Sequence, residues 1–227
     1  MHTLFFLHDA AVALLRRRSE QVKTAVLLFA HASLFGFFFP DLRNDFGEWA
    51  RNVLIFLLFL SPLARLFPIP LLQLLMGMRR QFGILFAYLV SVHGLGYFFD
   101  PNFFQFAIAP HLAAPLQIDL RLLFGIFAYT LTLPLLFTSN NVSLRLLKGN
   151  WKKLHRIVYL VFVLGMLHAF TIREASGVWE ALFIISVYLA LKVFARYPNI
   201  SGLLSLKKFV AEEYVRYRLL NTEKSVG

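Results

Sequence analysis

The chain has 227 residues, of which 59% are hydrophobic and only 15% are charged, against about 25% charged residues in an ordinary soluble domain. This composition indicates a membrane protein, and the formal net charge of +11 does not indicate nucleic-acid binding, because the basic residues lie between apolar runs and form no continuous face. The absence of cysteine excludes disulfides and every metal centre that needs a thiolate ligand.

The N-terminal segment, residues 1–21, is predicted to lie in the membrane interface. Its apolar run, Leu4 to Leu15, has about 12 residues and is interrupted by Asp9, which is too short for a span of about 20 residues. It does not match a signal peptide either, because the positive charge of Arg16 to Arg18 follows the apolar run.

The central part of the chain, residues 22–195, is predicted to be a six-helix transmembrane bundle, so the fold class is all-α and polytopic. Each apolar stretch reaches the length of about 17 to 20 residues that a membrane-crossing helix needs. Turn signals such as Pro40-Asp41 and Asn140-Asn141 separate the stretches. The predicted spans are 22–39, 50–67, 81–99, 119–138, 154–172 and 178–195.

The C-terminal segment, residues 196–227, is predicted to form an amphipathic helix on the inner membrane surface. Apolar residues from Leu203 to Leu220 recur at helical spacing, with lysines and glutamates between them. The segment is too short for a nucleotide-binding domain, and no G-x-G-x-x-G motif occurs in the chain. We therefore expect a single domain over residues 1–227.

The distribution of basic residues predicts the orientation. With six spans and both termini inside, all but four of the 23 lysines and arginines fall on inner segments. Cytoplasmic loops of membrane proteins carry this excess of positive charge, so both termini are expected in the cytoplasm. The four outer residues are Arg43, Arg51, Arg121 and Arg173.

Two histidines lie deep in predicted spans of the same design, each with a basic start followed by an apolar run. His93 follows Arg80 by 13 residues and His168 follows Lys153 by 15, so both lie about 20 Å above the inner face on parallel helices. Ionisable residues at such depth are rare and usually functional. The pair is predicted to bind the iron of one haem, with Gly94 and Gly96 letting the porphyrin edge approach the backbone. The alternative is that each histidine only bonds to a neighbouring helix.

A second cofactor site near the inner face stays open. His155 could bind an inner haem, a haem propionate or an electron donor, but it lies about 140° around the helix from His168. Arg79 stands where an opposing ligand would be expected, and arginine does not ligate haem. Arg79 and Arg80 could pair with propionates, or serve only as positive anchors of the span. His31 is interpreted as a packing residue, and His111 as a solvated loop residue.

Four segments together resemble the ferric-reductase-like transmembrane family: SPLAR from Ser61, MRRQFGILFAYLVSVH from Met78, LLFTSN from Leu135 and GNWKKLHRIVYLVFVLGMLH from Gly149. Within that family they are most similar to the MsrQ (YedZ) type, the haem-b membrane subunits of bacterial periplasmic methionine sulfoxide reductase systems. The resemblance covers the second to the fifth predicted span.

This resemblance implies a b-type haem with His93 and His168 as axial ligands and leaves room for a second haem, FMN or a quinone. It implies a protein of the bacterial inner membrane. Electrons would come from a cytoplasmic flavin reductase or the quinol pool and leave to a periplasmic molybdopterin-containing reductase. We expect an electron-transfer subunit more than an enzyme in its own right. Two alternatives stay open: a self-sufficient transmembrane ferric or quinone reductase, and a structural or transport protein without haem.

Overall fold

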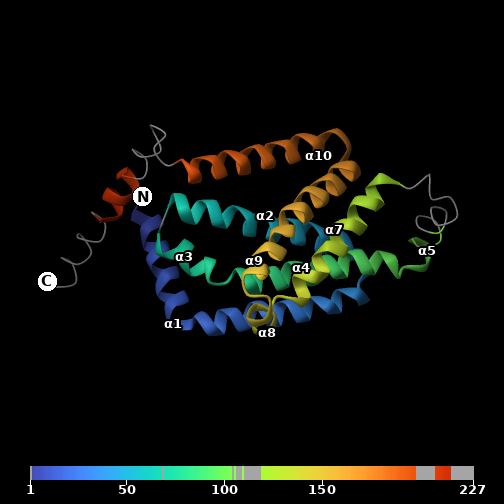
Figure 1. Cartoon of the computed structure of the whole chain (residues 1–227), viewed down its shortest axis with the longest axis horizontal. Coiled ribbons are helices and arrows are strands. Elements are labelled where there is room, and N and C mark those ends of the chain that lie inside the picture. The colour runs from blue at the N-terminus through green and yellow to red at the C-terminus, as the bar shows by residue number, and fades with distance from the viewer. Residues whose placement is uncertain are drawn as a thin grey trace. The chain divides into compact units, whose positions relative to one another are not determined.

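The computed structural model of the chain describes residues 2–67, 69–103, 105, 109, 119–197 and 208–215. These residues form helices and short connections, and no strand occurs among them (Figure 1). The elements are α1 (His2–Ala32), η1 (Ser33–Phe38), η2 (Pro40–Leu42), α2 (Arg43–Leu66), α3 (Pro70–Met76), α4 (Arg79–Phe98), α5 (Pro101–Phe103), α7 (Leu120–Phe137), α8 (Asn141–Leu147), α9 (Gly149–Leu154), η5 (His155–Ile157) and α10 (Val158–Arg196).

Five segments of the described chain are long and apolar enough to cross a membrane: Phe5–Phe38, Pro40–Leu66, Arg79–Phe98, Leu120–Phe137 and Gly149–Thr171. They confirm the prediction of a helical, multi-pass membrane protein. The sixth predicted span, 178–195, lies inside α10, whose ribbon turns back on itself along its length (Figure 1). The number of spans and the cytoplasmic termini stay predictions.

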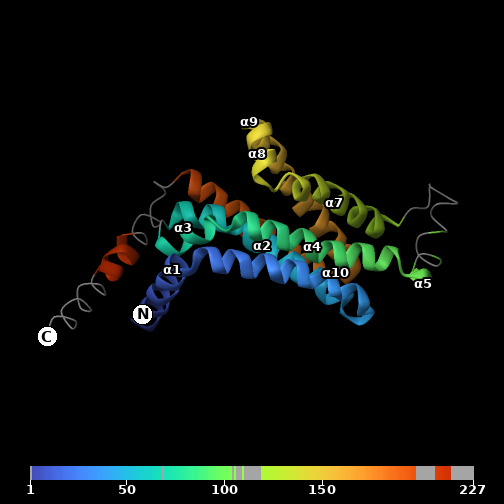
Figure 2. The ribbon, with the colours of Figure 1, turned by 90° about the horizontal axis from the view of Figure 1, so that it is seen from below.

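Helix α1 contains the boundary between the predicted interfacial segment and the first span. Its backbone leaves helical geometry at Arg18, where φ is −124° and ψ is 27°, so two helices meet at a kink there (Figure 2). A small helix over 208–215 belongs to the predicted amphipathic tail, and its Tyr214 hydroxyl donates to Asp9 Oδ1 at 2.9 Å. His111 and most of the tail lie outside the described residues.

Acidic residues lie at the starts of two helices, α7 and α2. Asp119 caps α7 by accepting a hydrogen bond from the backbone N–H of Arg121. Helix α2 begins at Arg43, earlier than the predicted start at residue 50, and Asp45 lies in its first turn. A carboxylate there is favoured because the exposed N–H groups of a helix start carry partial positive charge. Arg51 consequently lies within the helix.

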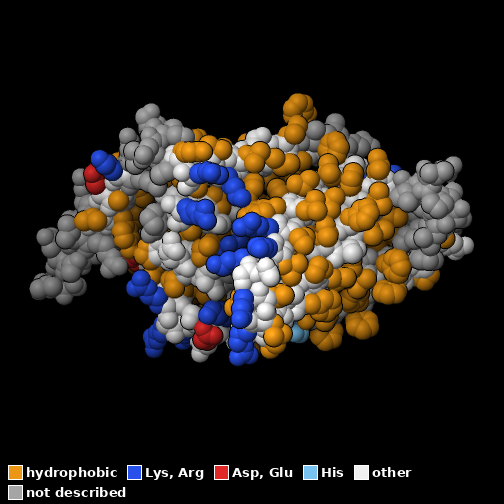
Figure 3. All heavy atoms as spheres, viewed as in Figure 1, with side chains coloured by type: hydrophobic (Ala, Val, Ile, Leu, Met, Phe, Trp, Pro, Cys, Tyr) orange, Lys and Arg blue, Asp and Glu red, His pale blue; other side chains and the backbone are white. Residues whose placement is uncertain are grey.

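The chain forms two compact units, one of residues 1–23, 58–78 and 186–227, and the other of residues 24–57 and 79–185. In the second unit α4 packs against α7 and η1 and buries residues such as Leu89 and Val92. Large apolar side chains of α7 stay exposed, Phe127 by 51% and Phe137 by 71%, as expected for a surface that faces lipid. Hydrophobic side chains cover α7, whereas Lys and Arg side chains gather over α8 and α9 (Figure 3).

Candidate functional site

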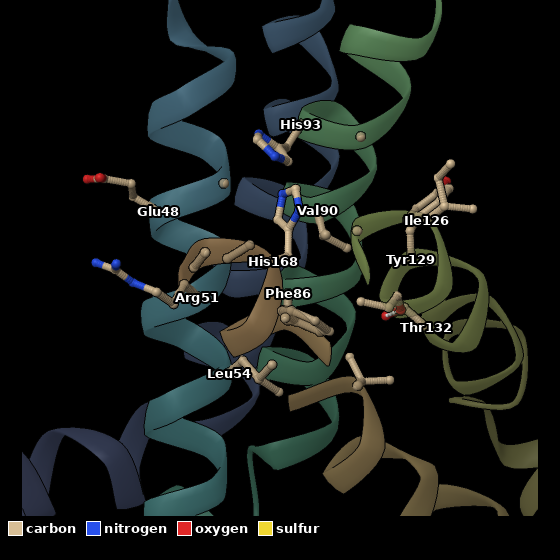
Figure 4. A pocket seen from close by; sticks show the side chains of 18 of the residues that line it. Glu48, Arg51, Leu54, Phe86, Val90, His93, Ile126, Tyr129, Thr132 and His168 are labelled. Atoms are coloured by element: carbon tan, nitrogen blue, oxygen red, sulfur yellow. Dashed lines mark hydrogen bonds between the residues drawn. The ribbon is translucent and has the colours of Figure 1, made fainter. Parts of the chain in front are cut away.

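A cavity of about 630 Å³ lies in the second unit, between side chains of α2, α4, α7 and α10. Apolar residues make up most of its wall, among them Leu54, Phe86, Ile126 and Phe162. Its volume is within the range of about 300 to 1,000 Å³ that cofactor and ligand sites occupy. Both histidines of the predicted pair, His93 and His168, line this cavity (Figure 4).

His93 reaches the cavity from α4, and its ring lies against the first turn of α2. Its Nδ1 is 2.8 Å from the carbonyl oxygen of Arg43. A carbonyl can only accept, so Nδ1 carries the proton and donates it, which leaves the lone pair of Nε2 free to bind a metal. The ring comes so close to α2 that a Cβ at Gly47 would lie 2.6 Å from Nδ1.

His168 is held in the same way. It projects from α10, and its ring lies against the first turn of α7. Its Nδ1 donates to the carbonyl oxygen of Arg121 at 2.7 Å. A Cβ at Gly125 would lie 2.9 Å from both Cε1 and Nδ1 of the imidazole. His168 therefore adopts the same tautomer as His93, with Nε2 free.

The two rings face each other across the cavity. Their centroids are 6.2 Å apart and their planes make an angle of 72° (Figure 4). Two imidazoles bound by nitrogen on opposite sides of one metal ion have ring centres roughly 6 Å apart, since each metal–nitrogen bond is about 2.0–2.1 Å. Among the described residues, neither Nε2 has a hydrogen-bond partner. The arrangement can bind a metal centre from two sides.

Several charged side chains lie near His93 and His168, but none lies between the two imidazole rings. Arg43 pairs with Asp100 at 2.6 Å and lies over the ring of Tyr97, whose hydroxyl donates to Asn44 at 2.7 Å. The hydrogen bond from Arg43, together with the backbone N–H of Phe103, lowers the pKa of the Asp100 carboxyl below its usual value.

A second ion pair joins Arg51 of α2 to Glu180 of α10 at 3.4 Å. Both Arg51 and Glu48 line the cavity, but their charged groups point away from the histidine rings (Figure 4). The space between the two imidazoles is therefore bordered by neutral side chains.

The two glycines expected beside the cofactor differ in their surroundings. Gly94 lines the cavity, and a Cβ there would make an ordinary contact of 3.8 Å with Tyr129. Gly96 is buried against the side chain of Arg43, whose Nε would lie 3.2 Å from a Cβ, and it does not line the cavity.

The remaining predicted site residues lie outside the cavity. Nε2 of His155 is 3.0 Å from the Thr138 hydroxyl, and its ring stacks on Trp151 with centroids 3.9 Å apart. Arg79 and Arg80 begin α4, and Arg80 donates to the Asn141 side chain at 2.5 Å. None of these residues contributes to the cavity wall.

His31 is not a cavity residue either. Its Nδ1 donates to the carbonyl oxygen of Leu27 on its own helix, and its Nε2 is 3.4 Å from the Tyr88 hydroxyl. The described residues contain no group of three or more His, Cys, Asp or Glu side chains that could hold a metal ion. Any metal in this cavity would consequently depend on two protein nitrogens and on ligands from another molecule.

The residues that receive the two imidazoles were not expected from the sequence. They are the carbonyls of Arg43 and Arg121 and the glycines four positions later, Gly47 and Gly125. Each pair belongs to a pentapeptide R-x-x-F-G, RNDFG at 43–47 and RLLFG at 121–125. This short repeat is the signal that could have indicated them.

The chain is similar to several known membrane proteins. The family model described as ferric reductase like transmembrane component matches residues 46–166, an interval that contains His93, Gly47 and Gly125. Curated relatives named protein-methionine-sulfoxide reductase heme-binding subunit MsrQ match from Agrobacterium fabrum (32% identical), Rhizobium meliloti (33%) and Polaromonas naphthalenivorans (31%).

These matches cover 66%, 65% and 64% of this chain, and the same shares of the three relatives. The chain thus covers slightly less than two thirds of the length of each. No solved structure matches the chain.

Proposed function

Because this chain belongs to the ferric reductase-like transmembrane family, we propose that it is a haem-binding electron-transfer subunit of a methionine sulfoxide reductase system. In this proposal His93 and His168 bind the haem iron through their Nε2 atoms. The printed names of the relatives, which describe heme-binding subunits of such systems, support the cofactor and the system.

The observation that carries the proposal is that both imidazoles are oriented by the same kind of hydrogen bond. Each Nδ1–H is fixed by a backbone carbonyl, at 2.8 Å for His93 and 2.7 Å for His168. Metal-ligating histidines almost always donate their other ring N–H to such a group, which sets the tautomer and the ring orientation. Packing alone would not require two histidines whose Nε2 atoms both lack a hydrogen-bond partner among the described residues.

The residues present fit a haem. A porphyrin brings its own equatorial ligands, so it needs two protein nitrogens rather than a cluster of three or more. Most of the cavity wall is apolar, which suits a flat hydrophobic macrocycle. Held by His93 and His168, the iron would supply one-electron transfer at this site.

We propose a single haem of the b type. His93 and His168 are the two histidines that line the cavity, and the chain has no cysteine to anchor a haem covalently. His155 is engaged by Thr138 and Trp151 instead of facing a second ligand. The hydrogen bond from Arg80 to Asn141 supports a role for Arg80 in joining α4 to α8.

The proposed direction is from the cytoplasm to the periplasm across the bacterial inner membrane. The basic surface over α8 and α9 suits the cytoplasmic side, where a flavin reductase or a quinol would supply electrons (Figure 3). A periplasmic molybdopterin-containing reductase would accept them. Reduction of one methionine sulfoxide consumes two electrons and two protons and yields methionine and water, so a one-electron carrier must act twice per turnover.

The haem is tested by spectroscopy of the purified chain. Wild type should give the reduced-minus-oxidised spectrum of a b-type haem at one haem per chain, and both His93→Ala and His168→Ala should lose it. His155→Ala and His31→Ala serve as matched controls and should keep one haem. A folded wild-type protein without haem, or a half-normal haem content in His155→Ala, would contradict the proposal.

The electron-transfer role is tested in proteoliposomes that enclose a reductant. Oxidised haem should become reduced from the side of α8 and α9, and ferric chelates outside should be reduced only slowly. Rapid reduction of chelates without a protein partner would instead favour a self-sufficient ferric reductase.

A further inference from the structure

The two histidines share a docking geometry on the helices that receive them. In both cases an imidazole donates to a carbonyl in the first turn of a neighbouring helix and covers the residue four positions later. That residue is Gly47 on α2 and Gly125 on α7. The two helices and the two histidines come from four different segments, so the recurrence is not a local effect of one turn.

Helix geometry explains why these positions are glycine. In an α-helix the side chain of a residue leans toward the N-terminus and covers the preceding turn, including the carbonyl of the residue four positions before it. An imidazole packed against the helix can approach that carbonyl more closely where this side chain is missing. The Cβ distances of 2.6 Å at Gly47 and 2.9 Å at Gly125 are shorter than real Cβ contacts.

We propose that Gly47 and Gly125 are positioning residues, which hold His93 and His168 by leaving the carbonyls of Arg43 and Arg121 open to their Nδ1–H groups. The missing side chain at each glycine determines where the imidazole ring lies and therefore where its Nε2 points. The use of the two Nε2 atoms as iron ligands rests on the proposed function above. The close contact between each imidazole and its glycine does not depend on the proposed function.

The chain carries its own control for this inference. A third R-x-x-F-G pentapeptide, RRQFG at 79–83, lies at the start of α4. A Cβ at Gly83 would meet no described atom within 4 Å. In a helix alanine is favoured over glycine, so Gly83→Ala should leave the melting temperature unchanged or raise it. The same change at Gly47 or Gly125 should lower it.

The inference is tested by two double-mutant cycles on thermal stability, one for each histidine and its glycine. Gly47→Ala should lower the melting temperature of the full chain in detergent by about 4 °C or more. In the His93→Ala background, where the ring is absent, the same change should have no destabilising effect. Gly125→Ala and His168→Ala should behave in the same way.

The double-mutant cycles still test the inference if a single glycine variant does not fold. In that case His93→Ala/Gly47→Ala should recover folding, because the clashing ring is gone. An equal loss of stability in both backgrounds would overturn the inference, since the glycine would then serve something other than the ring. These cycles need no haem, so they remain valid if the wild type binds none and the proposed function fails.

A second measurement distinguishes positioning from a general structural role. In haem-loaded protein, Gly47→Ala and Gly125→Ala should shift the midpoint potential and the low-spin electron paramagnetic resonance signal, or lose haem at least tenfold more readily. Gly83→Ala should match the wild type in both. Wild-type spectra and potentials in the Gly47→Ala and Gly125→Ala proteins would overturn the inference while leaving the haem assignment intact.

Discussion

His93 and His168 are held by neutral main-chain oxygens, and this choice of partner suits their place in a membrane protein. A carboxylate partner would add a negative charge, and a charge in the hydrocarbon region is costly unless it is paired. A helix carbonyl fixes the same N–H without a charge, because its oxygen has a second lone pair beyond the intrahelical bond. The site is thus oriented at little electrostatic cost.

Asp100 provides a test of the charged contacts around this site. Its pKa is lowered by the hydrogen bond from Arg43, so its stabilising effect is complete well above the unfolded-state pKa of about 3.9. The effect is lost as pH falls through the lower folded-state value. Asp100→Asn should therefore lower the melting temperature at pH 7, and the difference from wild type should shrink in acid as pH falls through the folded-state pKa of Asp100.

The exposed Asp41 in η2 offers a control for this measurement, because no ion pair of Asp41 occurs among the described residues, and Asp41→Asn should lower the melting temperature at pH 7 by less than Asp100→Asn does. A deficit of Asp100→Asn that stayed constant from pH 7 into acid would show that the ion pair with Arg43 is not its cause.

Between elements, one polar cluster joins the end of α7 to α9 and η5. Trp151 donates its indole N–H to the carbonyl oxygen of Thr138 at 2.8 Å, and the Thr138 hydroxyl meets His155. The last carbonyls of a helix have no intrahelical partner, so a side-chain donor from a neighbouring helix satisfies one of them. This explains the position of His155 without a cofactor.

Removing the indole N–H donor of Trp151 should lower the stability of the protein without changing its haem content. Trp151→Phe keeps an aromatic ring against His155 and deletes the indole N–H. We expect a loss of about 1 kcal/mol and a melting temperature lower by about 2–4 °C. Haem content should be unchanged. Trp179→Phe is the control because Trp179 is 73% exposed on α10, and equal losses in the two variants would contradict the capping role.

At the scale of the whole molecule, the predicted orientation can be tested because the chain contains no cysteine. Single cysteines can be placed at two exposed positions, Lys152 in α9 and Phe99 just after α4. A membrane-impermeant maleimide should label Phe99→Cys in intact spheroplasts, and Lys152→Cys only after permeabilisation. Labelling with the opposite pattern would invert the proposed direction of electron flow.

Much of the fold could be predicted from the sequence because hydropathy and length report directly on membrane crossing. The starts of two helices show the limit of such prediction. The capped α7 begins within a residue of the expected position, whereas α2 begins at Arg43 and not at residue 50. Its polar first turn, with Asn44 and Asp45, looks like a loop by hydropathy and is helical because tertiary contacts satisfy it.

The amino-acid sequence alone was enough to identify a helical membrane protein and to predict two histidines at matching depth. Composition and the spacing of basic residues and histidines along a helix suffice for that. The groups that orient those histidines, and the contact of His155 with Thr138, could be identified only from the folded structure. Such contacts depend on how each helix is rotated against its neighbours, which is a property of side-chain packing that hydropathy does not encode.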